Sequence, residues 1–419
     1  MTKFSIKELL KLINSYTLFS LLLNLTRLFA GLICIRWVSP EEMGAWQIML
    51  LIEGYLMFAR FGIINALNRE LPYYLGRNRK EKALKYLDVS EWYIICVSLL
   101  FFILIISSLL VYSPHLNHWK ECVIVLSVYL PIKFYSGFIE FTFRSGRDFK
   151  KLAIVQFALT LFTFLTLIMV YYMGFYGYLI RILFLTILGC LLLIWYRPFR
   201  FNPRMDFPYF RKLFRMGIPL FISNYSQSVF NSFPGILLLH YGNVGSLGLF
   251  YPVNIVMNFG TLIPGIVSTY LYPQTSFEYG ANRDARQVIR KNESASLHSM
   301  IMMLPVIVIS FFLLPFVFNK FAPEYHEAMA ASQWALLFAM LSCLSLMLNP
   351  FAILKAWKPM YIYLIMAGIF TWFVPYLMLH YWRTYSILLT LVLSLLIVKI
   401  LLIGVNYICI GLIKSNYKT

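Results

Sequence analysis

Charged residues are scarce in this chain of 419 residues. They make up 13% of the sequence, whereas soluble proteins contain about a quarter. Hydrophobic residues make up 60%, and the mean hydropathy is +0.74. A chain of this composition has too little polar surface to fold as an ordinary soluble domain, so the sequence predicts a protein that lies in a lipid bilayer.

The motifs of several common enzyme classes are also absent. The chain has no GxxxxGK[ST] phosphate-binding loop, no GxSxG nucleophile elbow and no HExxH zinc motif. Its six cysteines are scattered and include no CxxC pair, so neither a disulfide framework nor a metal site is indicated. We therefore expect no enzyme activity, no bound metal and no resident cofactor.

Long apolar stretches are abundant, and each is long enough to span about 30 Å of hydrocarbon. The expected fold is all-α and polytopic, with twelve transmembrane helices. The predicted spans are residues 15–38, 42–66, 90–112, 121–143, 152–172, 175–196, 216–240, 246–272, 296–318, 328–354, 360–381 and 386–412. The first span carries polar residues and ends without a small-residue cleavage site, so we interpret it as retained and not as a signal peptide.

Lysine and arginine are distributed unequally between the two sides of the predicted membrane. The N-terminal segment, the even-numbered loops and the C-terminal tail hold 27 of the 36 basic residues. Because short basic loops stay in the cytoplasm, both termini are predicted to be cytoplasmic. The net charge of +19 is then mainly a topology signal, and no nucleic-acid partner is expected. The outward loops are all short, which also argues against a membrane glycosyltransferase or polymerase.

Residues 7–87 recur 204 positions later without a gap. Gly31, Gly44 and Gly76 match Gly235, Gly248 and Gly280. Six spans per half is an even number, so the halves should enter the membrane in the same orientation. The predicted division is a six-helix lobe over 1–196, a basic cytoplasmic linker over 197–215 and a second six-helix lobe over 216–419.

The repeat also pairs two basic segments, GRNRKEKALKYL (76–87) and GANRDARQVIRK (280–291). Both are rich in helix formers. We predict short basic helices on the inner membrane surface, which either attract anionic lipid headgroups or gather an anionic substrate.

Polar residues form stripes on otherwise apolar helices. Ser20, Asn24 and Arg27 have i, i+4, i+7 spacing, which places them on one helix face. Their repeat equivalents, Asn224, Ser228 and Asn231, have the same spacing. The candidate substrate-binding residues are Arg27, Arg60, Glu53, Ser20, Asn24, Asn224, Gln227, Ser228, Asn231, Asn254 and Asn258.

Ionisable residues at membrane depth cost about 2.5–3.5 kcal/mol each at the centre of a lipid-facing helix, so they should face protein or water. Lys133, Glu140 and Lys399 are secondary candidates of this kind. Arginines suit phosphate, and amides and hydroxyls suit sugar hydroxyls. The alternatives stay open: the charges form structural ion pairs, and the amides join helices by hydrogen bonds.

The run from Arg36 to Gly76, RWVSPEEMGAWQIMLLIEGYLMFARFGIINALNRELPYYLG, resembles the polysaccharide branch of the multidrug/oligosaccharidyl-lipid/polysaccharide (MOP) flippase superfamily. The matching elements are a Pro-x-x-x-Gly turn followed by an aromatic residue, a span that ends in Phe-Gly-Ile, and Ala-Leu-x-Arg before a glycine-led basic loop. Arg60 departs from this pattern, because relatives often carry an acidic or small residue there. Its charge suits an acidic glycan.

The resemblance implies a MATE-like transporter that moves an undecaprenyl-pyrophosphate-linked oligosaccharide across a bacterial inner membrane by alternating access, for O-antigen, capsule or exopolysaccharide. The implied partners are the lipid-linked glycan, membrane lipids and proteins such as a polysaccharide polymerase. Coupling to a proton or sodium gradient is left open. The alternatives are a drug or cation antiporter of the same superfamily and a non-transporting scaffold of a glycan-assembly complex.

Overall fold

A computed structural model describes residues 15–76, 79–111, 117–145, 148–199, 202–354, 356–382 and 386–416. Every regular element in these ranges is a helix. A helix lies over each of the twelve predicted spans. The helices are α2 (Ser15–Cys34), α3 (Pro40–Leu56), α4 (Ile63–Gly76), α5 (Lys80–Val111), α6 (Trp119–Ser145), α7 (Phe149–Leu165), α8 (Leu167–Tyr196), α9 (Phe207–Tyr241), α10 (Val244–Asn282), α11 (Ala285–Phe321), α12 (Ala328–Ser342), α13 (Asn349–Ile353), α14 (Trp357–Tyr381) and α15 (Ile387–Asn416).

Seven of the described helical segments are long and apolar enough to cross a membrane, and α2 adds a shorter apolar helix over Leu18–Cys34. Many of their large apolar side chains are exposed; Ile309 is 65% exposed and Phe312 is 74% exposed. Exposure on this scale is unfavourable in water and favourable in lipid. The protein is therefore a multi-pass membrane protein, whereas the number twelve and the cytoplasmic termini stay predictions.

Two compact units divide the chain. The first, here called the N-unit, comprises Leu18–Ala30 and Glu41–Val229; the second, the C-unit, comprises the described residues within Met1–Thr17, Gly31–Pro40 and Phe230–Thr419. The predicted lobe boundaries at 197–215 are not tested by this division.

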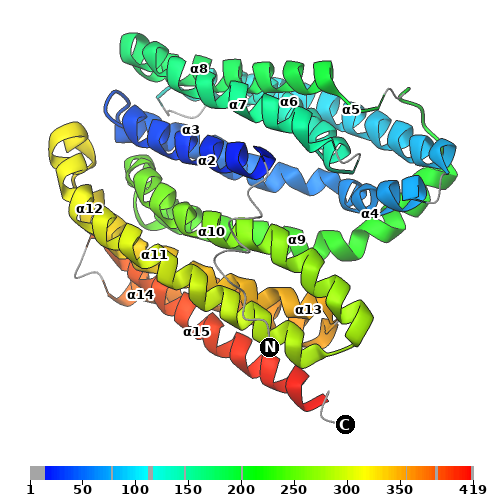
Figure 1. The fold of residues 1–419 in the computed structure, drawn as a ribbon. Coiled ribbons are helices and arrows are strands. Elements are labelled where there is room, and N and C mark those ends of the chain that lie inside the picture. The colour runs from blue at the N-terminus through cyan, green and yellow to red at the C-terminus, as the bar shows by residue number, and fades with distance from the viewer. Residues whose placement is uncertain are drawn as a thin grey trace. The chain divides into compact units, whose positions relative to one another are not determined.

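In the N-unit, α6 packs between α5 and α8, and α7 packs against α8 (Figure 1). The interior is aromatic: Trp46, Phe134, Phe138 and Phe143 are fully buried. A kink at Gly174, where φ is 55°, interrupts α8 close to the predicted boundary between two spans. Polar side chains on these helices thus lie beside a core that contains large aromatic side chains.

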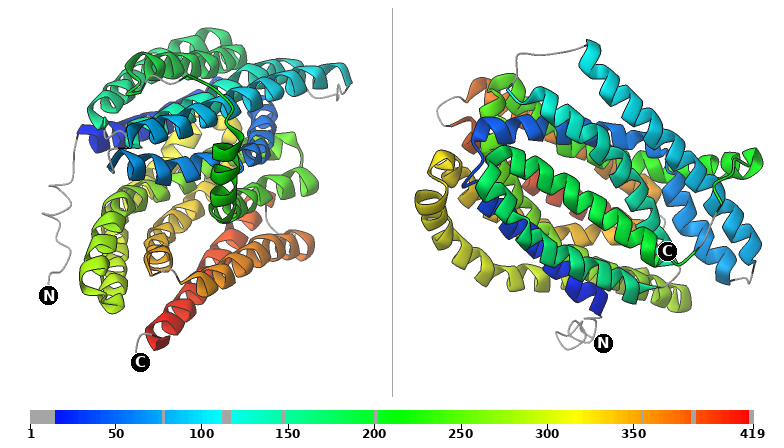
Figure 2. Two further views of the ribbon diagram at one scale, coloured as in Figure 1. Left: turned by 90° about the vertical axis from the view of Figure 1, so that its right-hand side faces the viewer. Right: turned by 90° about the horizontal axis from the view of Figure 1, so that it is seen from above.

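In the C-unit, α12 packs against α10, α11 and α15, and α14 lies beside α15 in all three views (Figures 1 and 2). A Cβ on Gly260 of α10 would lie 2.3 Å from the Cα of Ala339 on α12, so glycine allows these two backbones to touch. A 3₁₀ segment, η3 (Cys343–Leu348), separates α12 from α13.

The basic segments after Gly76 and Gly280 differ from our prediction. They are not separate surface helices. Residues 80–87 and 285–291 form the first turns of α5 and α11, which continue without a break into the apolar spans, whereas Gly76 and Gly280 still belong to α4 and α10. The charges do not interrupt the helices, because lysine, arginine and glutamate are good helix formers and leave the backbone hydrogen bonds intact.

Candidate functional site

A polar cavity of about 230 Å³ lies within the N-unit. The predicted stripe of Ser20, Asn24 and Arg27 on α2 forms one wall, and Glu140 of α6 and Gln156 of α7 stand among the other lining residues. The remaining lining residues are apolar: Leu23, Leu152, Val155, Leu159 and Leu193. The structure thus gathers a cation, a carboxylate, two amides and a hydroxyl in one apolar-walled pocket.

Gln156 was not predicted from the sequence. It is only 8% exposed, and its Oε1 has no hydrogen-bond partner among the described residues. A buried carbonyl oxygen without a donor is costly, so the cavity offers an acceptor for a ligand or for water. The signal was present: Gln156, Thr160 and Thr163 are all buried and have the same i, i+4, i+7 spacing as the α2 stripe.

Glu53 and Lys133 form an ion pair between α3 and α6. The Lys133 Nζ lies 2.6 Å from Glu53 Oε1 and donates to the Tyr129 hydroxyl at 2.5 Å. The pair joins two helices, so no spacing along either helix alone indicates it. This contact supports the structural alternative for Glu53 and Lys133, since each already neutralises the other.

Arg60 sits at a break between α3 and α4. The 3₁₀ segment η1 (Met57–Arg60) is followed by Phe61 and Gly62, whose φ values are 39° and 71°. The guanidinium lies 4.9 Å from the ring centroid of Phe134, and its buried Nε has no hydrogen-bond partner in the described part of the chain. Arg60 is therefore held by a cation–π contact, with donor capacity left over.

A glycine contact supports this break. A Cβ on Gly62 would lie 2.2 Å from the carbonyl oxygen of Gly217 on α9, and a Cβ on Gly217 would lie 2.5 Å from the carbonyl oxygen of Gly62. Only glycine fits at either position. The backbone of α9 thereby fixes the position from which Arg60 extends.

The structure describes only some of the polar side chains that were predicted on α9 and α10. The backbones of Asn224 and Gln227 belong to α9, but their side chains lie outside the described ones; Ser228 and Asn231 are exposed on the same helix. On α10, Asn258 Nδ2 donates to Asn254 Oδ1 at 3.0 Å. The i, i+4 pair thus forms as its spacing suggests, and the role of all six as substrate contacts stays a prediction.

Lys399 lies on α15 in the C-unit. Its Nζ is 5.1 Å from the ring centroid of Phe338 on α12, and no described carboxylate forms a salt bridge with it. Lys399 is therefore stabilised by an aromatic ring and not by an ion pair.

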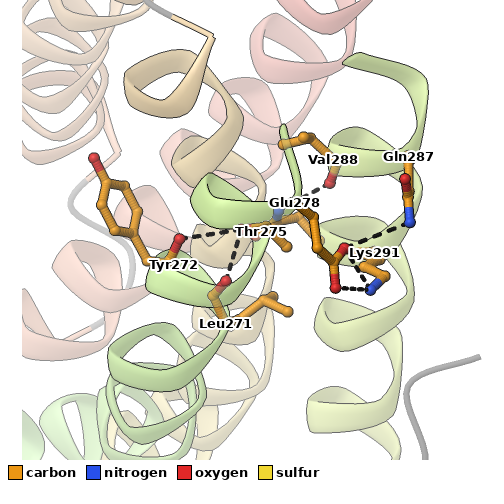
Figure 3. Close-up of polar contacts among 8 residues, drawn as sticks. Leu271, Tyr272, Thr275, Glu278, Gln287, Val288 and Lys291 are labelled. Carbon is orange, nitrogen blue, oxygen red and sulfur yellow. Dashed lines mark hydrogen bonds and ion pairs between the residues drawn. The ribbon is translucent and has the colours of Figure 1, made fainter. Parts of the chain in front are cut away.

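A second polar cluster, not predicted from the sequence, lies at the corner between α10 and α11. Glu278 accepts from Lys291 Nζ at 2.7 Å and from Gln287 Nε2 at 3.4 Å (Figure 3). Farther along these helices, the fully buried Asn292 accepts from Asn349 Nδ2 at 3.2 Å. Figure 3 shows Glu278 facing the α11 side chains, so this cluster fastens the corner.

The fold is that of transporters of the MOP superfamily. An inward-facing multidrug-resistance MATE family transporter of that superfamily matches with a TM-score of 0.75 and 15% identity over 96% of both chains. An outward-facing conformation of a MATE family transporter matches with a TM-score of 0.67 and 15% identity, covering 98% of this chain and 97% of that one. A MATE in a straight conformation matches with a TM-score of 0.65 and 14% identity over 94% and 95% of the two chains.

The sequence carries the identification further. Residues 33–321 match the model of a family described as polysaccharide biosynthesis protein, and the chain belongs to that family. The match contains the Arg36–Gly76 run, so the resemblance to the polysaccharide branch of the superfamily is confirmed. No curated protein sequence is significantly similar to this chain.

Proposed function

We propose that the protein is a flippase that moves a lipid-linked oligosaccharide, carried on undecaprenyl pyrophosphate, from the inner to the outer leaflet of a bacterial inner membrane. The observation that carries this proposal is the N-unit cavity, where Arg27 stands with Asn24, Ser20 and Gln156. The family match supports a role in polysaccharide biosynthesis, and the fold supports transport.

The chemistry of the cavity suits one part of such a substrate. The planar guanidinium of Arg27 can donate two parallel hydrogen bonds to a phosphate or to the carboxylate of an acidic sugar. Asn24, Ser20 and the free Gln156 carbonyl suit sugar hydroxyls. The pocket of about 230 Å³ is smaller than the 300–1,000 Å³ of typical ligand sites, so it accepts one group and not a whole oligosaccharide. In this proposal the polyprenyl chain stays in lipid.

Glu140 gives this cavity a second role in the proposed cycle. A carboxylate in the same pocket attracts Arg27 when no substrate is bound, and an incoming anion would compete for the same guanidinium. Arg27 thus has two alternative partners, Glu140 and the substrate anion. Exchange between them allows substrate binding to favour one conformation over another, as alternating access requires.

Deletion of the gene and complementation test the proposal. Wild type, Arg27→Ala and Arg27→Ala/Glu140→Gln are compared at equal membrane levels, with Arg36→Ala as a control because Arg36 is exposed and stacks on Phe321. We expect the lipid-linked repeat unit to accumulate on the inner leaflet in the deletion and in both Arg27 variants, and not in Arg36→Ala.

The double variant separates substrate binding from ion pairing. If Arg27 serves only to neutralise Glu140, replacing both residues restores surface polysaccharide. Restoration would overturn the role proposed for Arg27. Normal surface polysaccharide in the deletion strain, with no second flippase present, would overturn the function itself.

A drug or cation antiporter is the second candidate, because the similar solved structures include a multidrug-resistance transporter. Such a protein should bind cations through buried acids. In the N-unit, however, Glu53 is already neutralised by Lys133. Export of cationic dyes by the purified protein in vesicles, abolished by Glu140→Gln, would favour the antiporter.

A further inference from the structure

A buried carboxyl group lies outside the cavity. Glu91, in the first half of α5, is 3% exposed. Its Oε1 accepts a hydrogen bond of 2.6 Å from the Tyr135 hydroxyl of α6. Its Oε2 is buried and has no hydrogen-bond partner among the described residues.

An ionised carboxylate in this position is hard to sustain. Burial of a carboxylate without a counter-ion is strongly unfavourable, and an oxygen without a hydrogen-bond donor adds to that cost. A neutral carboxylic acid carries its proton on one oxygen and accepts on the other, which is the arrangement that one bound and one unbound oxygen allow. No described cation forms a salt bridge with Glu91.

The charges around Glu91 are few. Asp88 lies three residues earlier on the same helix, and Arg197, directly after α8, is near enough to attract a carboxylate at Glu91. On α6 the facing titratable group is Tyr135, while Lys133 is occupied by Glu53. On α8, Cys190 lies near Tyr135. On α4, which also packs against α5, Tyr74 is engaged by Lys212, and Glu70 is buried.

A route to water begins one helical turn away. Asp88 is only half-buried and accepts from the backbone N–H of Asn202 at 2.8 Å, in an exposed contact. A proton on Glu91 therefore has an accessible carboxylate within one turn of the same helix.

We propose that Glu91 and Tyr135 form a proton-binding site, in which the Glu91 carboxyl holds a proton at neutral pH and exchanges it with the aqueous phase on the Asp88 side. The ligand is a single proton. Its loss leaves a carboxylate that keeps the Tyr135 hydrogen bond and attracts Arg197, so the packing of α5 against α6 and the residues after α8 responds to pH.

Infrared spectroscopy of the whole purified protein tests this site without substrate. The difference spectrum between wild type and Glu91→Gln should contain the carbonyl stretch of a protonated carboxyl at pH 7, and this band should disappear as the pH is raised. Glu81→Gln is the matched control, since Glu81 lies exposed on the same helix, and its difference spectrum should lack the band.

Tyr135→Phe provides a second test that keeps Glu91. Removal of the hydroxyl takes a donor from the carboxylate, so the band should persist to a pH higher by about one unit or more. Tyr93→Phe is the control, because Tyr93 donates instead to the Ala59 carbonyl. The proposal is overturned if Glu91 gives no protonated band at pH 7, or if Tyr135→Phe leaves the pH dependence unchanged. Neither result depends on whether the protein moves a glycan.

Discussion

The second span of each repeat is built differently in the two halves. In the first half, α3 ends at Leu56, and η1, Phe61 and Gly62 break the helix before α4 begins. In the second half, the equivalent residues lie inside α10, which runs from Val244 to Asn282. At the 204-residue offset, Arg60 corresponds to Pro264 and Gly62 to Ile266. The helix therefore breaks where the sequence has Arg-Phe-Gly and continues where it has a proline.

This contrast indicates that a tertiary contact, and not local helix propensity, determines where the second span breaks. Proline removes one hydrogen bond and disfavours a helix interior, yet α10 continues through Pro252 and Pro264. The N-unit break is stabilised by the backbone contact of Gly62 with Gly217. An intramembrane arginine stands at the broken helix and has no counterpart at the unbroken one.

The largest expected effect comes from filling this contact. Gly62→Ala adds a Cβ at a φ of 71° and within 2.2 Å of the Gly217 carbonyl oxygen. Strain and overpacking each cost roughly 1–3 kcal/mol, so we expect a loss of about 2–6 kcal/mol. Gly265→Ala, in the corresponding part of α10, meets nothing within 4 Å and should change stability by less than about 1 kcal/mol. Thermal unfolding of the detergent-purified variants measures both; equal losses would contradict the comparison.

The lysines Lys133 and Lys399, both on predicted spans, differ in their partners. The N-unit pairs Lys133 with Glu53, whereas Lys399 of the C-unit rests on Phe338. Lys133→Ala leaves the buried Glu53 carboxylate without its partner, and because Lys133 itself is 41% exposed we expect a loss of about 1–3 kcal/mol, less than for a fully buried pair. Lys133→Leu/Glu53→Leu should recover most of it, and Lys399→Ala should cost less than Lys133→Ala. Chemical unfolding of wild type and the three variants measures these effects. A double variant as unstable as Lys133→Ala would contradict the expectation that the loss comes from an unpaired Glu53 carboxylate.

A smaller effect is expected at the corner after the second span. Tyr74 and Glu278 occupy equivalent positions at the 204-residue offset, and each binds a lysine. Glu278 binds Lys291, while Tyr74 accepts from Lys212 Nζ at 3.2 Å. Lys212 Nζ also lies 5.7 Å from the ring centroid of Tyr74, so we expect Lys212→Ala to cost about 0.5–1 kcal/mol, as for exposed cation–π contacts. Lys291→Ala should cost more, because Lys291 is half-buried whereas Lys212 is exposed.

The first corner should also respond to alkaline pH. The hydrogen bond from Lys212 lowers the pKa of Tyr74, and hydrogen bonds to Tyr86 and Tyr74 raise the pKa of Lys212. The contribution of Lys212 is thus complete below its usual pKa and is lost as the pH rises through its raised value. Ultraviolet titration should show Tyr74 ionising at lower pH than in Lys212→Ala. If Tyr74 ionises at the same pH in wild type and in Lys212→Ala, the contact between Lys212 and Tyr74 is contradicted.

Much of the fold was predictable because long apolar runs determine helices, and the spacing of Ser20, Asn24 and Arg27 placed them correctly on one wall. The pairing of Glu53 with Lys133 was not, since helix periodicity shows which residues share a face and not which faces meet. The break at Gly62 depends on Gly217, a partner 155 residues away in the sequence (217 − 62 = 155), and no local pattern marks it. Glu91 was missed because its hydrogen-bond partner, Tyr135, lies on another helix.

In the proposed mechanism, Arg27 binds the anionic part of a lipid-linked glycan during transport. The most direct measurement reconstitutes the purified protein in vesicles with the lipid-linked oligosaccharide and follows its transfer between leaflets by the accessibility of its sugar to an external enzyme. We predict transfer by wild type and Arg36→Ala, at least a tenfold slower rate for Arg27→Ala, and partial recovery with Arg27→Lys. Equal rates for wild type and Arg27→Ala would contradict the account.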